Sequence, residues 1–169
     1  MRLTRDMTVI CGQGLVGVVK AVYPNTALVM LASDPAFRIG VRIVGSAQIG
    51  ILAGQGTDRA VLQLLDSQSS TQIGDVLLSR GSRGDKPFVP GVPVGEVTYV
   101  SDLAGAVSQL AEVKYFAHLN ALSVVAVVVK APETDPRDAL VPPKPIPTPT
   151  PTVTIFVTPT PTPTPTPIK

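Results

Sequence analysis

The stretch that decides the fold is Pro87-Phe88-Val89-Pro90-Gly91-Val92-Pro93-Val94-Gly95, with three prolines and two glycines in nine residues. It leads directly into Glu96–Val100, a run rich in β-branched residues that is typical of a strand. Proline fixes φ and removes a backbone donor, whereas glycine permits positive φ. The stretch therefore predicts one defined bend that feeds a strand. It contains no catalytic side chain, so its contribution is to set the path of the backbone.

Composition divides the chain into a folded part and a tail. All 14 glycines lie between Gly12 and Gly105, whereas 13 of the 18 prolines lie in residues 131–169. Aromatic residues make up only 4% of the chain and Trp is absent, so the core must be built from Val, Leu, Ile and Ala. The many β-branched residues favour strands. We expect the folded part to cover roughly residues 7–130.

Short candidate strands alternate with turn signals along the folded part, a spacing that is typical of closed barrels or sandwiches. The polar run Asp66–Gln72 has no apolar residue and predicts a boundary between two halves, 7–66 and 67–130, which pack on each other. The C-terminal part can also contribute strands to the first half. We also expect one short helix at Tyr115–Asn120. The predicted strands are Thr8–Cys11, Leu15–Val22, Thr26–Leu31, Arg38–Val44, Ile49–Ala53, Ala60–Leu64, Val76–Ser79, Val94–Val100, Val107–Val113 and Val124–Val129.

The tail at 131–169 contains an apolar segment between two proline-rich parts. Residues 131–151 are rich in proline and polar residues, and Thr158–Pro167 alternates Thr and Pro strictly. Proline at every second position prevents helices and sheet ladders, so we expect polyproline II or disorder. Between these parts lies Val153–Val157. We interpret it either as an apolar island in a linker or as a strand that adds to a sheet edge.

Charge and cysteine content exclude several classes of function. The net charge is only +2 and the basic residues are scattered, so nucleic-acid binding is not expected. Cys11 is the single cysteine, which excludes an internal disulfide and favours a buried structural thiol. The longest apolar run, Val124–Val129, is far shorter than the ~20 residues of a membrane span. Residues 1–6 are too short and polar for a signal peptide.

Two motifs match functional signatures by letter but are better explained as turns. Gly12-Gln13-Gly14-Leu15-Val16-Gly17 fits the dinucleotide fingerprint, which requires a helix to begin at the loop. Pro24 and the β-branched residues before it are incompatible with that helix, so we predict a turn between strands and no cofactor. Arg83-Gly84-Asp85 spells an adhesion tripeptide, and we predict that its glycine serves a loop.

Catalytic and metal sites have no positive support in the sequence. His118 is the only histidine, and the serines lack the G-x-S-x-G elbow, so neither a catalytic triad nor a histidine-based zinc site is expected. The candidate carboxylates all fall in turn contexts, where Asp caps backbone groups. These residues are Asp58, Asp66, Asp75, Asp85 and Asp102.

Five segments, in the same order, resemble the extracytoplasmic β domain of the MreC family of rod shape-determining proteins. The resemblance covers about residues 7–129 and is clearest in the proline-rich bend. The matching segments are Met7–Val19, Pro24–Pro35, Val41–Ile43, Gln72–Ser79 and Phe88–Gly95.

The resemblance implies two small six-stranded β-barrels side by side, an all-β scaffold without a catalytic triad. It also implies a role in cell-wall elongation outside the cytoplasmic membrane, with self-association and binding of MreD and a class B penicillin-binding protein. We predict Phe88 and Val89 as partner contacts, with packing over a barrel end as the alternative. The family's transmembrane helix and coiled coil are missing here, so we expect membrane attachment only through a missing N-terminal anchor. The open alternatives are a degenerate trypsin-like hydrolase and a generic β binding module with a proline-rich ligand tail.

Overall fold

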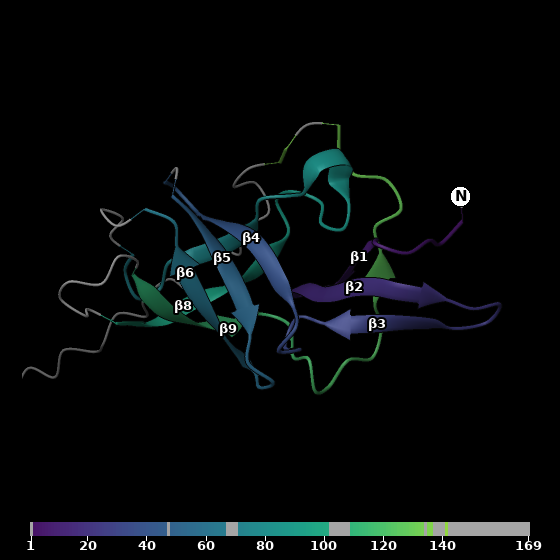
Figure 1. The fold of residues 1–169 in the computed structure, drawn as a ribbon, viewed down its shortest axis with the longest axis horizontal. Helices are drawn as coiled ribbons and strands as arrows, with labels where there is room; N and C mark the ends of the chain where they lie inside the picture. Colours follow the sequence, from purple (N-terminus) through teal and green to yellow (C-terminus); the bar gives the residue numbers. More distant parts are fainter. Residues whose placement is uncertain are drawn as a thin grey trace, which may run out of the picture.

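The computed structural model describes residues 2–46, 48–66, 71–101, 109–133, 135–136 and 141, and these form an all-β fold (Figure 1). The all-β prediction is confirmed. A single 3₁₀ turn, η1 (Arg83–Asp85), interrupts the strands of this described part. The strands are β1 (Thr8–Cys11), β2 (Gly14–Val22), β3 (Ala27–Leu31), β4 (Arg38–Ile43), β5 (Ile49–Gly54), β6 (Arg59–Leu64), β7 (Val76–Ser79), β8 (Pro93–Ser101), β9 (Leu110–Tyr115) and β10 (Ala126–Val127).

Six strands close into a barrel in the order β4-β5-β6-β9-β8-β7, and every neighbouring pair is antiparallel. Alternation along β6 shows how the sequence fills the barrel: Ala60, Leu62 and Leu64 are buried, and the residues between them face outward. A small aliphatic core suffices because the barrel interior is narrow and neighbouring strands supply matching residues. The predicted six-stranded barrel is therefore present.

The second unit is a four-stranded sheet in the order β10-β1-β2-β3, which lies beside the barrel (Figure 1). Its central strand β2 is buried from Gly14 to Val19, whereas β3 has no buried residue. Within the described residues this unit is a four-stranded sheet and not the second six-stranded barrel that we expected.

The expected division into successive halves, 7–66 and 67–130, differs from this strand order. The barrel takes β4–β6 from the first half and β7–β9 from the second, and the sheet joins β1–β3 to β10. Neither half could satisfy its strand edges alone, because the barrel is sealed by the pairs β4–β7 and β6–β9. The polar run Asp66–Gln72, of which residues 67–70 lie outside the described residues, carries no information about these distant pairings.

The helix predicted at Tyr115–Asn120 is wrong. Tyr115 ends β9, and the residues after it turn, with the Ala121 N–H bonded to the His118 carbonyl oxygen at 3.0 Å. The helix-forming residues of Leu110–Tyr115 are instead paired between β6 and β8, so tertiary pairing outweighs intrinsic propensity. Tail segments 142–169, including Val153–Val157, lie outside the described residues.

Candidate protein-interaction surface

The proline-rich bend joins the barrel to the sheet through buried hydrogen bonds. The Thr8 hydroxyl of β1 donates to the Pro87 carbonyl at 2.8 Å and accepts the Val89 N–H at 3.0 Å. From the barrel side, the Ser79 hydroxyl donates to the Val89 carbonyl at 2.6 Å and accepts the Val92 N–H at 2.9 Å. The bend is thus held by one hydroxyl from each unit and by backbone hydrogen bonds, such as that from the Gly91 N–H to the Ser79 carbonyl oxygen at 2.8 Å. The hydroxyls matter because the prolines of the bend have no backbone N–H to donate.

Phe88 and Val89, the predicted partner contacts, are only 7% and 5% exposed. The Phe88 ring packs edge-to-face on Phe37 with centroids 5.4 Å apart. Buried side chains offer little surface to a partner, so the geometry favours a packing role, as in the alternative of packing over a barrel end. Direct contact by these two residues stays a prediction.

A second bridge between the units comes from Tyr115 at the end of β9. Its hydroxyl donates to the Ala32 carbonyl oxygen, just after β3, at 2.6 Å. Burial raises the pKa of Tyr115, so the hydroxyl keeps the proton that this bond requires. The barrel and the sheet are therefore tied at two places, around Thr8 and around Ala32.

The glycine-rich motif Gly12–Gly17 forms the β1–β2 hairpin, as predicted, and β2 follows where a dinucleotide site needs a helix. Gly14 has φ +150°, and a Cβ there would collide with the Pro93 carbonyl oxygen. A Cβ at Gly17 would collide with the Met30 carbonyl oxygen on β3. These glycines allow close backbone approach within the fold, which explains the motif without a ligand.

The remaining sequence candidates do not converge on a reaction centre. His118 is exposed, and its backbone N–H contacts the Gln13 side chain at 3.3 Å. Cys11 is a free thiol that is half-buried, less enclosed than we expected. Asp75 accepts the Gln72 N–H at 2.9 Å, the capping role predicted for it, and Asp102 lies outside the described residues. Across the described ranges no three His, Cys, Asp or Glu side chains are grouped to hold a metal ion.

The Arg83-Gly84-Asp85 turn borders a cavity of about 350 Å³ between the N-terminal segment and the chain after β10. Asp6 and Asp85 line it with φ of 60° and 57°, an uncommon conformation for residues other than glycine. Lys86 and Lys130 line it too, and Lys130 pairs with Glu133 at 3.2 Å. Because the cavity lining carries both acidic and basic side chains, it favours neither an anionic nor a cationic ligand.

The outward sides of β5, β6, β9 and β8, called here the outer barrel face, carry large exposed apolar side chains among polar ones. Its most exposed apolar side chains are Ile51, Leu110 and Tyr99, at 40%, 40% and 57%. Ile51 is paired with Gln63, which is paired with Leu110, so these residues form one row across three strands. Exposed large apolar side chains on neighbouring strands of one face are a feature of protein-interaction sites.

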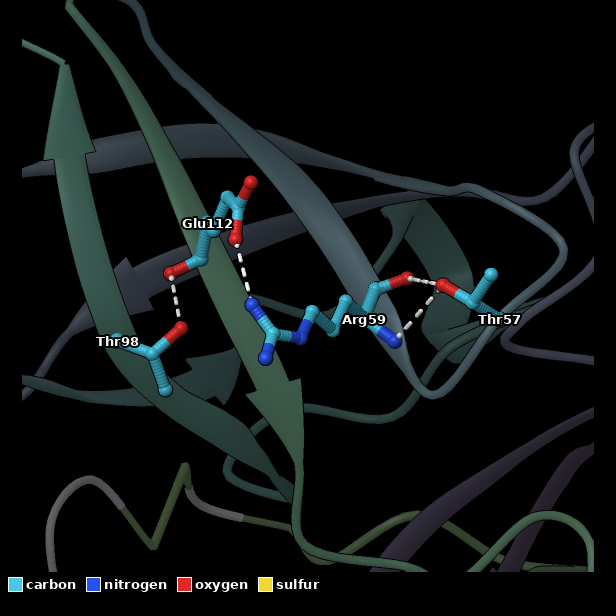
Figure 2. A network of polar contacts seen from close by, with 4 residues as sticks. All are labelled: Thr57, Arg59, Thr98 and Glu112. Carbon is cyan, nitrogen blue, oxygen red and sulfur yellow. Dashed lines mark hydrogen bonds and ion pairs between the residues drawn. The ribbon is translucent and has the colours of Figure 1, made fainter.

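A polar network lies within the outer barrel face (Figure 2). The Arg59 guanidinium of β6 donates to the Glu112 carboxylate of β9 at 2.9 Å. Thr98 contacts the Glu112 carbonyl at 3.4 Å, and Thr57 bonds the backbone of Arg59. Tyr99 pairs with Glu112 across the strands, so the two residues are neighbours on the barrel. An exposed aromatic group beside charged groups is the composition of many interfaces.

Sequence reasoning did not find the outer barrel face. A signal was present in β5, where Ile49, Ile51 and Ala53 are apolar although the alternation already buries the residues between them. A strand that is apolar on both sides either lies between two layers or has a surface for a partner. Only the barrel order shows which neighbours share that surface.

Comparison with known proteins identifies the family. A sequence model described as "Rod shape-determining protein MreC, barrel core" matches residues 2–129. The chain belongs to the MreC family. MreC proteins are non-enzymatic shape-determining scaffolds, so this chain is a scaffold protein and not an enzyme. A search of curated protein sequences gives no match.

Solved MreC structures are similar to this chain over most of its length. MreC from Pseudomonas aeruginosa is 27% identical with a TM-score of 0.67, covering 75% of this chain and 81% of that one. The major periplasmic domain of "the cell shape-determining filament MreC" is 28% identical, with a TM-score of 0.54 and coverage of 68% and 71%. The Helicobacter pylori complex of penicillin-binding protein PBP2 with MreC is similar in fold, with a TM-score of 0.55, 17% identity and coverage of 70% and 73%.

Within the described ranges, no helix has the length and apolar character needed to cross a bilayer. The solved periplasmic domain that resembles this chain suggests an extracytoplasmic location.

Proposed function

We propose that this MreC-family chain acts outside the cytoplasmic membrane as a scaffold of cell-wall elongation that binds a class B penicillin-binding protein. The family match over residues 2–129 carries the proposal. The H. pylori complex supports it, because a chain of the same fold was solved with a penicillin-binding protein. By resemblance to the family, MreD is a further proposed partner.

We assign the transpeptidase contact to the outer barrel face. It presents Ile51, Leu110 and Tyr99 on a closed, rigid barrel, and a preformed surface avoids the entropy cost of ordering a loop on binding. The Arg59–Glu112 pair beside Tyr99 supplies the polar rim that interfaces of this kind carry. Phe88 and Val89 then support the scaffold from inside, through the bend between barrel and sheet.

Self-association is the second part of the proposed function. It is supported by the two edges that the four-stranded sheet has among the described residues, β10 and β3, because an edge strand presents backbone groups that can pair with another chain. Pairing of β3 with β10 of a second copy would be heterologous and would extend into a filament unless a rotation closed it, whereas pairing of β3 with β3 of a second copy would give a closed dimer.

The test is binding of the full chain to the soluble ectodomain of the cognate transpeptidase, measured by biolayer interferometry. Tyr99→Asp combined with Leu110→Asp is expected to raise Kd about tenfold or more, since each places a charge in an apolar contact. Tyr23→Asp is the matched control, because Tyr23 is also a tyrosine and is 57% exposed like Tyr99, but follows β2 and lies outside the outer barrel face. Absence of wild-type binding would contradict the scaffold proposal, and an equal loss with Tyr23→Asp would contradict the assigned face.

A further inference from the structure

The strand β3 is an apolar edge of the sheet in the described part of the chain. All five residues of Ala27–Leu31 are apolar and none is buried, and Leu28 is 57% exposed. Within the described residues, β3 pairs with no strand other than β2. Natural edge strands are usually guarded by a charge, a proline or a covering segment. The sequence of β3 has neither a charge nor a proline, and the irregularity in its pairing lies in β2, between Val19 and Ala21. A covering segment is therefore the protection that we expect.

The backbone of β3 has a defined free side. The Met30 carbonyl faces β2, where a Cβ at Gly17 would collide with it. Neighbouring residues of a strand direct their backbone groups to opposite sides, so Val29 directs its N–H and C=O away from β2. This side of β3 is the hydrogen-bonding edge of the sheet, and β3 lies outermost beside β2 in Figure 1.

The chain itself carries a segment suited to this edge. Val153-Thr154-Ile155-Phe156-Val157 has five residues with high strand propensity, the length of β3, and no charge. Pro151 and Pro159 bracket it, which limits pairing to a short stretch because proline cannot donate to a ladder. The opposite sheet edge, β10, has only two residues and offers a shorter template.

The chain between the folded part and this segment is long enough for the segment to reach β3. Asp135 lies 3.7 Å from the Arg42 guanidinium, which fixes the start of the tail on the barrel. The 16 residues between 137 and 152 span on the order of 50 Å when extended. A folded part of this size has a radius of gyration of roughly 14 Å, so the segment reaches any point on its surface.

We propose that Val153–Val157 pairs with the free side of β3 in the same chain and forms a fifth strand of the sheet. The tail then acts as an intramolecular cap on the edge that the proposed self-association uses. This consequence rests on the proposed function, whereas the pairing does not. Assembly would require release of the cap, so the tail would limit self-association by competing for β3.

Amide hydrogen exchange of Val29, followed by NMR on the full chain at low concentration, tests the pairing directly. Ile155→Asp places a charge in the middle of the segment and is expected to speed Val29 exchange about tenfold or more. Thr160→Asp is the control, since it adds the same charge within the Thr-Pro repeat outside the segment. The barrel amides, such as that of Leu62, are expected to stay unchanged in both variants.

The outcomes separate the cap from the scaffold proposal. Equal Val29 exchange in wild type and Ile155→Asp would overturn the cap, whatever the chain binds. Val29 protection that rises with protein concentration, together with a dimer mass in sedimentation, would show a second copy at β3 and would also overturn it. Faster Val29 exchange without any increase in assembly would support the cap and contradict self-association through β3.

Discussion

The barrel and the four-stranded sheet use the same aliphatic residues but differ in how their strands end. The barrel is closed, so each of its six strands has two neighbours, whereas the sheet leaves β10 and β3 with one neighbour each among the described residues. Closure hides the backbone and leaves side chains as the surface for recognition, as on the outer barrel face. An open edge exposes the backbone itself, which recognises strands with little dependence on sequence.

The barrel and the sheet contribute different groups to the hydrogen bonds that join them. The barrel contributes Ser79 and Tyr115, and the sheet contributes Thr8 and the Ala32 carbonyl. Each bridge includes a buried hydroxyl, and buried hydroxyls must be paired to avoid a desolvation cost. The relative position of barrel and sheet therefore depends on a few polar groups, while each unit's interior depends on packing.

The largest effect is expected in the barrel interior. Leu62 is fully buried in β6, and Leu62→Ala should lower the free energy of unfolding by about 3 kcal/mol, because it removes buried methyl groups and leaves a cavity. Urea denaturation measures the change. Leu110→Ala, on the exposed side of the adjacent strand, is the matched control and should cost under about 1 kcal/mol. Equal losses would contradict the assignment of interior and exterior.

The next largest effect is expected in the sheet and not in the barrel. Gly17→Ala would drive a Cβ into the Met30 carbonyl, so β2 and β3 must move apart at a cost of about 2 kcal/mol. Hydrogen exchange should then quicken in β3 more than in β6. Gly12→Ala is the control, since no atom lies within 4 Å of a Cβ built there. If the amides of β3 exchange as slowly in Gly17→Ala as in the wild type, the proposed difference between the sheet and the barrel would be contradicted.

A smaller effect is expected at the junction. Thr8→Val keeps the shape of the side chain but removes the hydroxyl that serves Pro87 and Val89. The Val89 N–H would lose its acceptor, and a loss of about 1.5 kcal/mol is expected. Thermal unfolding should show a lower Tm, with the two units losing cooperativity. An unchanged Tm would mean that the bend holds its conformation without the sheet.

The smallest effect should come from the surface ion pair. Arg59 and Glu112 are 60% and 45% exposed, so Glu112→Gln is expected to change the free energy of unfolding by less than about 0.5 kcal/mol. Its influence on transpeptidase binding should be larger than on stability and should fade at high salt. A large stability loss that persists in high salt would show that this pair holds the barrel together.

Local patterns predicted the strands well because each depends on neighbouring residues. Thr8–Cys11 and Val76–Ser79 coincide with β1 and β7, and Leu15–Val22 misses only the first residue of β2. The prediction failed at Tyr115–Asn120, where the composition of the preceding residues favoured a helix. There β9 is fixed by its pairs with β6 and β8, which lie far away in the sequence.

The candidate surface was less predictable than the fold. Phe88 and Val89 drew attention because they stand in a conspicuous bend, yet that bend is buried between the two units. Tyr99 and Leu110 gave no local signal, since an apolar residue in a strand is expected on either face. Their exposure follows from pairing with Glu112 and Gln63, which no spacing in the sequence reveals.

The sequence by itself determined that this chain turns repeatedly as short aliphatic strands, that it bends at Pro87–Gly95, and that its motifs carry no reaction centre. Proline and glycine act through their own φ preferences, so these features are local. Only the tertiary structure decided which strands close the barrel, which strand is left as an open edge, and which apolar side chains face outward. Those outcomes depend on hydrogen bonds between distant strands, and each such pairing is set by the fold as a whole.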